Sequence, residues 1–152
     1  MEWTHPDGYL VSDDPARLDV GVVHRFLSHE AYWSPGIARD VVERGIAGSI
    51  PFGLYAPDGG QAGFARVVTD RATFGFLADV FVLDGHRGRG LGVFLVASAL
   101  DHPELQGLRR IVLATDDAHD LYARFGFAPL AYPERWMQRG VEPSRARHDE
   151  RR

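Results

Sequence analysis

The stretch that decides the fold runs from Asp79 to Gly92 and reads DVFVLDGHRGRGLG. Its apolar first half predicts a strand, and the dense glycines and arginines that follow predict a turn. From Leu91 to Ala99 the apolar residues return at the spacing of one helix face. The stretch therefore predicts a strand, a loop and the start of a helix.

The loop and the helix start together predict a site for a phosphate or pyrophosphate group. The first N–H groups of a helix have no partner within it, and the helix dipole adds positive charge there. Glycines let an anion approach the backbone, and Arg87 and Arg89 add charge beside it. The alternative is a loop that only turns the chain and whose arginines are solvated.

Two familiar phosphate-binding loops do not match this stretch. A Walker loop needs a lysine, and all 17 basic residues of this chain are arginine. The dinucleotide fingerprint needs the spacing G-x-G-x-x-G, whereas the glycines here are Gly88, Gly90 and Gly92. Nucleotide binding by the loop therefore stays only as a weaker alternative.

Composition limits the remaining possibilities. A chain of 152 residues with 45% hydrophobic content is long enough for one core, so we expect one domain over residues 1–139 and a disordered tail over 140–152. The net charge of −4 argues against a nucleic-acid partner. The absence of cysteine excludes disulfides, thiolate metal sites and a cysteinyl intermediate. No membrane-spanning or export segment is evident, so we expect a cytoplasmic protein. We also expect no bound metal.

The rest of the sequence predicts a mixed α/β chain. The strand that follows the central helix should run parallel to the strand before it, because a helix connects the two. In order we expect an irregular start over residues 1–7, an edge strand over 9–12, a helix from about Pro15 with Val22, Val23, Phe26 and Leu27 on one face, a helix over 37–49, three antiparallel strands between 52 and 83, a buried strand over 110–114, a short helix near 118–125, and closing strands over 127–130 and 136–138.

Two segments carry a resemblance to a known family. Arg87, Gly90 and Gly92 form Arg-x-x-Gly-x-Gly after a Val-x-Val strand, which resembles the acetyl-coenzyme A signature of the GCN5-related N-acetyltransferases (GNAT). Residues 118–127 resemble that family's Ala-x-x-x-Tyr-x-x-x-Gly-Phe segment. The resemblance implies the GNAT fold over residues 9–139: a mixed, mostly antiparallel sheet of six to seven strands, a V-shaped splay between the family's fourth and fifth strands, and about four helices.

The resemblance also implies how acetyl-coenzyme A, the cosubstrate, would be held. Its pantetheine arm would lie in the splay, and an N–H near Val80 or Phe81 would polarise the thioester carbonyl. Thr115 stands where many relatives carry asparagine, and it keeps a hydroxyl for a cofactor contact. The backbone of Phe81, Val82 and Leu83 would bond the pantetheine, and that of Arg87, Gly88, Arg89, Gly90, Leu91, Gly92 and Val93 would hold the pyrophosphate.

Two catalytic roles follow from the same resemblance. Tyr122 matches the tyrosine that protonates the departing thiolate in relatives; its alternative is a core aromatic. Asp79 is the only acid on its strand and is the candidate general base, unless it is a buried carboxylate that orders the loop. Glu30, His119 or solvent are the other candidate bases.

The expected function is transfer of an acetyl group from acetyl-coenzyme A to a primary amine, by direct attack in a ternary complex. The acceptor is a small-molecule or peptide amine, with Glu30, Tyr32 and Trp33 as candidate substrate-binding residues. The alternative is a catalytically silent coenzyme A sensor or protein-interaction module, with the Tyr32–Trp33 loop meeting a partner. Both a monomer and a homodimer are compatible with the sequence.

Overall fold

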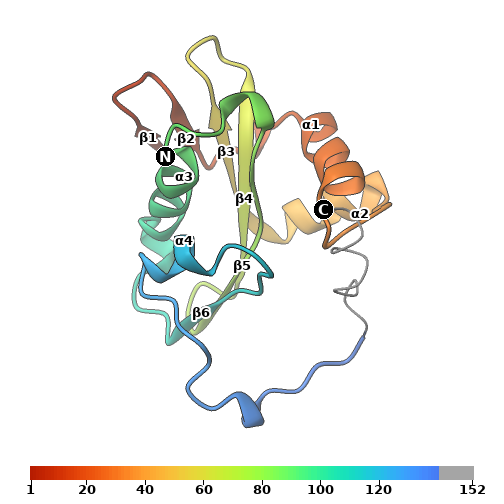
Figure 1. Cartoon of the computed structure of the whole chain (residues 1–152), viewed down its shortest axis with the longest axis vertical. Coiled ribbons are helices and arrows are strands. Elements are labelled where there is room, and N and C mark those ends of the chain that lie inside the picture. The colour runs from red at the N-terminus through yellow and green to blue at the C-terminus, as the bar shows by residue number, and fades with distance from the viewer. Residues whose placement is uncertain (141–152) are drawn as a thin grey trace.

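The computed structural model describes residues 1–140. The expected tail over 140–152 therefore lies, apart from Gly140, outside the described residues. Figure 1 shows a central sheet with helix α3 on one face and helices α1 and α2 on the other.

The sheet holds six strands in the order β1-β2-β3-β4-β5-β6. All neighbours pair antiparallel except β5 and β6, which are parallel, so the sheet is mixed as predicted. The strands are β1 (Glu2–Thr4), β2 (Leu10–Ser12), β3 (Ser49–Tyr55), β4 (Gln61–Thr69), β5 (Phe74–Val82) and β6 (Arg110–Val112).

Within residues 1–140, four α-helices flank this sheet, with short 3-10 turns between elements. Asp19 begins the first helix by accepting a hydrogen bond from the N–H of Val22 at 3.1 Å, which places its start later than the expected Pro15. The helices are α1 (Val20–Arg25), continued by a π-helical turn η2 (Phe26–Glu30), then α2 (Arg39–Ala47), α3 (Leu91–Leu100) and α4 (His119–Ala123). The 3-10 turns are η1 (Pro15–Arg17), η3 (Asp84–His86), η4 (Pro103–Leu105) and η5 (Pro133–Arg135).

Two hydrophobic cores lie on opposite faces of the sheet. Strand β3 contributes Phe52 and Leu54, both fully buried, to the core beneath α3. Strand β4 contributes Phe64 to the other core, which lies beneath α1, η2 and α2. Because both faces are covered, the central strands are apolar almost throughout.

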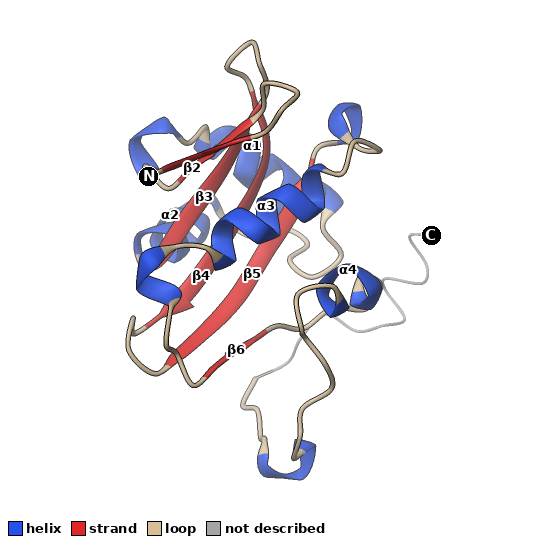
Figure 2. Cartoon of the chain, turned by 90° about the vertical axis from the view of Figure 1, so that its left-hand side faces the viewer, coloured by secondary structure: helices blue, strands red, loops and turns tan. Residues whose placement is uncertain are grey.

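Strands β5 and β6 pair over only three residues. Phe74, Gly75 and Phe76 face Arg110, Ile111 and Val112, and the pairing ends there although β5 continues to Val82. Figure 2 shows β6 leaving the edge of the sheet from this point. The predicted splay is therefore present beside the C-terminal half of β5.

The structure corrects three expectations at the ends of the chain. The first residues are not irregular, because β1 pairs with β2 and takes the edge position expected for residues 9–12. The closing strands expected over 127–130 and 136–138 are not strands, and residues 128–140 are exposed. Pro129 supplies one reason, because proline cannot donate to a strand ladder. The outer edge of β6, three residues long, offers little to pair with.

Candidate active site

The glycine loop leaves its backbone open to an approaching group. Gly88 and Gly90 have φ angles of +81° and +74°, a region that favours glycine. A Cβ built on either residue would meet no atom within 4 Å. Glycine is therefore needed here for the backbone conformation, and among residues 1–140 no side chain packs against these two positions.

Helix α3 begins directly after this loop and has no side-chain cap. Gly90 occupies the N-cap position, and the first intrahelical bond is the one from the N–H of Phe94 to the carbonyl of Gly90. The N–H groups of Leu91, Gly92 and Val93 precede that bond, so they have no partner within the helix. This uncapped helix start has the geometry on which the predicted anion site depends.

The Arg87 side chain forms hydrogen bonds within the protein, although its charge suggested a place beside a bound anion. Its Nε donates to the carbonyl of Val82 at 2.9 Å and its Nη1 to Asp84 Oδ1 at 3.0 Å. The side chain therefore braces the loop against the end of β5. Arg89 is exposed in the same loop.

The three residues expected to bond the pantetheine, Phe81, Val82 and Leu83, differ in the direction of their backbone N–H and carbonyl groups. Leu83 donates its N–H to the carbonyl of Ala62 at 2.8 Å, and its own carbonyl accepts from His86. Leu83 is thus engaged within the protein, which corrects its expected role. Because direction alternates along a strand, Val82 points toward the splay and Phe81 toward β4. Val80 and Val82 are the residues with backbone groups facing the splay.

Asp79 sits at a bulge in β5. Asp79 and Val80 together oppose one residue, Ala65, where the register with β4 shifts. Asp79 has a φ of +56°, a left-handed conformation that aspartate tolerates better than most residues. The bulge reverses the alternation of the strand, so Leu77 belongs to one core and Phe81 to the other.

The Asp79 carboxylate is held by two side chains from distant parts of the sequence. Its Oδ1 accepts from Nε1 of Trp33 at 2.8 Å, and its Oδ2 accepts from Nε of Arg66 at 2.7 Å. Arg66 Nη1 also donates to Ser49 Oγ at 3.0 Å. These bonds join the loop after η2 to strands β3, β4 and β5. The carboxylate therefore orders side chains, because both donors are side-chain groups, whereas a carboxylate that orders the loop would accept from backbone N–H groups.

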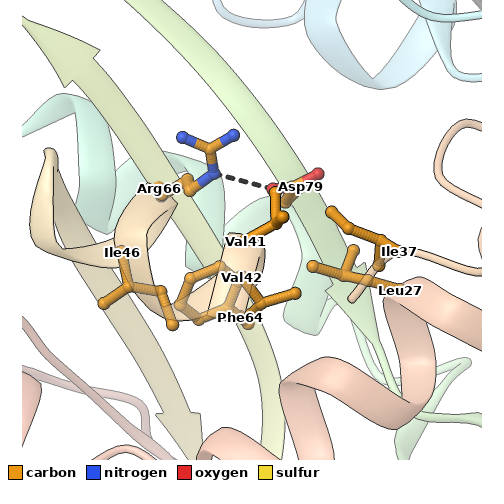
Figure 3. Close-up of a pocket in the computed structure, with 9 residues that line it drawn as sticks. Leu27, Ile37, Val41, Val42, Ile46, Phe64, Arg66 and Asp79 are labelled. Atoms are coloured by element: carbon orange, nitrogen blue, oxygen red, sulfur yellow. Dashed lines mark hydrogen bonds and ion pairs between the residues drawn. The ribbon is translucent and has the colours of Figure 1, made fainter. Parts of the chain in front are cut away.

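A pocket of about 100 Å³ opens beside this ion pair (Figure 3). The Arg66 and Asp79 side chains are 22% and 13% exposed, so a ligand in the pocket can reach both. The other lining residues come from η2, the following loop, α2 and β4: Leu27, Ile37, Val41, Val42, Gly45, Ile46 and Phe64. The pocket is an apolar chamber with one pair of opposite charges.

Tyr122 lies on α4 and is 9% exposed. Burial raises the pKa of Tyr122 to about 12, and the neighbouring Tyr32 and Asp117 add to the effect. The hydroxyl therefore stays protonated at neutral pH, as a proton donor must. Its ring also packs edge-on against Phe127, so the catalytic and core readings are compatible.

The Tyr32–Trp33 pair connects the two sides of the site. The hydroxyl of Tyr32 accepts from the N–H of Asp116 at 2.8 Å, beyond the end of β6. The two rings meet edge-on at 5.1 Å, and Trp33 reaches Asp79 on β5. The loop thus spans from the bulge of β5 to the segment after β6.

The other candidate residues, Thr115, Glu30 and His119, lie outside the pocket beside Asp79. Thr115 Oγ1 accepts from the N–H groups of Ala118 at 3.1 Å and Asp117 at 3.4 Å, so it orders the turn before α4. Glu30 and His119 are exposed. Among residues 1–140 no group of three His, Cys, Asp or Glu side chains could hold a metal, and no helix there has the length and apolarity to cross a membrane.

Arg66 is the site residue that sequence reasoning missed. It lies within β4, at Phe64-Ala65-Arg66-Val67, and a single arginine in an apolar strand has no local pattern that assigns it a partner. Its ion pair with Asp79 joins the neighbouring strands β4 and β5. The pair depends on the register of these strands, which only the folded sheet defines.

Comparisons with known proteins agree with this fold. Residues 47–127 match the family model described as the acetyltransferase (GNAT) family. A Gibberella zeae protein described as a candidate acetyltransferase is 34% identical over 145 residues, covering 82% of this chain and 80% of its own. A crystal structure of a GNAT-family protein from Xanthomonas campestris pv. campestris is 50% identical, with a TM-score of 0.86, covering 89% of this chain and 94% of its own.

More distant structures share the fold alone. N-acetylglutamate synthase from Neisseria gonorrhoeae, solved with coenzyme A and N-acetyl-glutamate, is 20% identical with a TM-score of 0.64 and covers 94% of this chain but 32% of its own. Fold, open helix start and sequence matches together define an acetyltransferase, and the chain belongs to the GNAT family.

Proposed function

We propose that this enzyme transfers an acetyl group from acetyl-coenzyme A to a primary amine in one ternary complex. The observation that carries the proposal is the open splay beside β5, which leads from the uncapped start of α3 to the bulge at Asp79. A tethered thioester laid along this edge would have its diphosphate at the helix start and its acetyl group near Asp79 and Tyr122.

The residues present fit this cosubstrate. The N–H groups of Leu91, Gly92 and Val93 and the exposed Arg89 would hold the pyrophosphate, while the backbone of Val82 would bond the pantetheine. The N–H of Val80, at the bulge, would polarise the thioester carbonyl. Thr115 contributes by fixing the turn before α4.

The chemical step needs a deprotonated amine and a protonated leaving group. The amine nitrogen attacks the thioester carbonyl carbon, the C–S bond breaks, and the sulfur leaves as a thiolate. Tyr122 would donate its hydroxyl proton to that thiolate, and Asp79 would accept the proton released by the attacking nitrogen. The absence of cysteine in the sequence removes a thiol-bound acetyl-enzyme from consideration.

Thermal-shift and thiol-release measurements on the purified protein test this function. Saturation with acetyl-coenzyme A should raise the melting temperature, because binding to the native state alone stabilises it. Incubation with a panel of primary amines should then release free coenzyme A thiol. Stabilisation without thiol release would instead support the silent sensor, and comparable stabilisation by ATP would point to a nucleotide site.

A further inference from the structure

The charges of the pocket beside Asp79 are arranged as a complementary pair. The Asp79 carboxylate uses one lone pair of each oxygen, on Trp33 and Arg66, and retains the others. The Arg66 guanidinium has five N–H donors and uses one on Asp79 and one on Ser49. The pocket therefore offers an acceptor for an ammonium next to donors that fit a carboxylate.

Gly45 on α2 allows the guanidinium to lie against the helix. A Cβ at this position would stand 3.7 Å from Arg66 Cζ and 3.8–3.9 Å from its two terminal nitrogens. The cation is thus fixed on one side by α2 and on the other by the Asp79 ion pair. A planar guanidinium fixed in this way is suited to bidentate recognition of a carboxylate.

The apolar part of the pocket limits the size of what it can hold. At about 100 Å³ it has room for about three groups the size of a water molecule, each of which takes about 30 Å³. Its walls are aliphatic apart from Phe64, and Val41 stands at the rim with 42% exposure. A branched chain of about three or four carbons fits this volume. A phenyl ring needs more room, since a cavity of about 150 Å³ holds benzene.

We infer that the acceptor is a short aliphatic α-amino acid, whose amine lies at Asp79, whose carboxylate binds Arg66 and whose side chain fills the pocket. This inference rests on the proposed function, because the amine must lie near the acetyl group that the bulge positions. The ion pair as a whole is neutral, and so is a zwitterionic amino acid. A polyamine would bring several positive charges to a pocket that already contains a guanidinium.

The test measures kcat/KM by thiol release for matched pairs of acceptors. Valine and leucine are compared with isobutylamine and isoamylamine, which lack only the carboxylate, and with phenylalanine. A charged hydrogen bond contributes about 1.5–3 kcal/mol, so each amino acid should exceed its amine by roughly 10- to 150-fold. Phenylalanine should react at least about 10-fold more slowly than leucine, because its ring does not enter the pocket.

Two variants locate the recognition in this pocket. Arg66→Gln should lower kcat/KM for leucine by roughly 10- to 100-fold more than it lowers kcat/KM for isoamylamine. Val41→Phe should narrow the rim and lower the rate with leucine more than the rate with alanine. Arg44→Gln, on the exposed face of the same helix, and Val68→Phe, at a similarly exposed valine outside the pocket, are the controls.

The outcomes separate this inference from the proposed function. Thiol release with amines but no preference for amino acids, or an equal fall for both acceptors in Arg66→Gln, overturns the inference alone. Calorimetric binding of leucine but not isoamylamine to the coenzyme A complex, without thiol release, supports the pocket assignment and contradicts the proposed transfer. Neither binding nor release overturns both.

Discussion

The glycine loop and the Asp79 corner lie at opposite ends of the same half of β5 and are built in opposite ways. The loop from Asp84 to Gly90 exposes backbone, with left-handed glycines and no side-chain cap on α3. The Asp79 corner is closed by side chains, as Trp33 and Arg66 arrive from other elements and bond one carboxylate. The proposed cofactor half thus depends on backbone conformation, whereas the proposed acceptor half depends on the packing of side chains.

The largest expected effect tests the backbone half. Gly90→Asp should weaken acetyl-coenzyme A binding by at least about 100-fold, because it strains a left-handed residue and places a negative charge at the helix start. Calorimetric titration measures the affinity.

Gly107→Asp is the matched control, since Gly107 has a φ of +80° and equally open space but lies outside the loop. It should lose similar stability and keep its affinity for the cosubstrate. Equal loss of affinity in both variants would show that strain, not the helix start, is what matters.

The next effect concerns the proton donor. Tyr122→Phe should lower kcat by about 100-fold with little change in the KM for acetyl-coenzyme A, the lower end of what a general acid contributes. Because burial raises the pKa of Tyr122 to about 12, the hydroxyl should not ionise between pH 8 and 10. The kcat of the wild type should therefore show no fall in this range that the variant lacks.

Tyr132→Phe serves as the control, because Tyr132 is 53% exposed and does not line the pocket beside Asp79. An unchanged kcat in Tyr122→Phe would return Tyr122 to a purely structural place in the core.

A smaller effect tests the side-chain half through stability. Asp79→Asn keeps a residue that tolerates the left-handed bulge and an oxygen for Trp33, but it leaves Arg66 without its ion pair. Asp79→Ala also loses the bond to Trp33. We expect Asp79→Ala to be less stable than Asp79→Asn by about 1 kcal/mol in urea unfolding.

The double variant Asp79→Asn with Arg66→Gln completes a cycle for this pair. A coupling free energy of about 1–3 kcal/mol is expected for partly buried groups in direct contact. A coupling near zero would mean that the corner is held by packing alone, and the comparison between the two halves would lose its basis.

The smallest effect concerns the turn that leads into β5. Thr73 donates its hydroxyl and its N–H to Asp70, and the N–H groups of Ala72 and Phe74 add to them, which holds the pKa of Asp70 well below its ordinary value of 3.8. A lowered pKa stabilises the fold above pH 3.8 and loses this effect as the pH falls. Asp70→Asn should therefore have a lower urea midpoint at pH 7, and the difference should close below about pH 4.

Asp58→Asn is the corresponding change in the β3–β4 turn, where Asp58 accepts from the N–H of Gly60. It should lower the midpoint less, because fewer bonds are lost. A constant difference between wild type and Asp70→Asn from pH 7 to pH 3 would contradict the assigned cause.

Much of the cofactor half could be predicted from the sequence, because its information is local. A glycine-rich loop between a strand and a helix predicts an open helix start, and the structure has one, with Gly88 and Gly90 at positive φ. Even there, the sequence did not reveal that Leu83 donates its N–H to the carbonyl of Ala62, or that the Arg87 side chain bonds the carbonyl of Val82. Those contacts depend on how β5 pairs with β4.

What the sequence determined by itself is the order of the central elements and the open glycine loop before α3, since helix and strand periods and glycine conformations act between neighbours in the chain. Only the tertiary structure decided that Asp79 meets Arg66 and Trp33, and that α2 closes an apolar pocket over them. Such contacts join residues 13 and 46 positions apart, and they depend on the sheet register and on a bulge that no local pattern encodes.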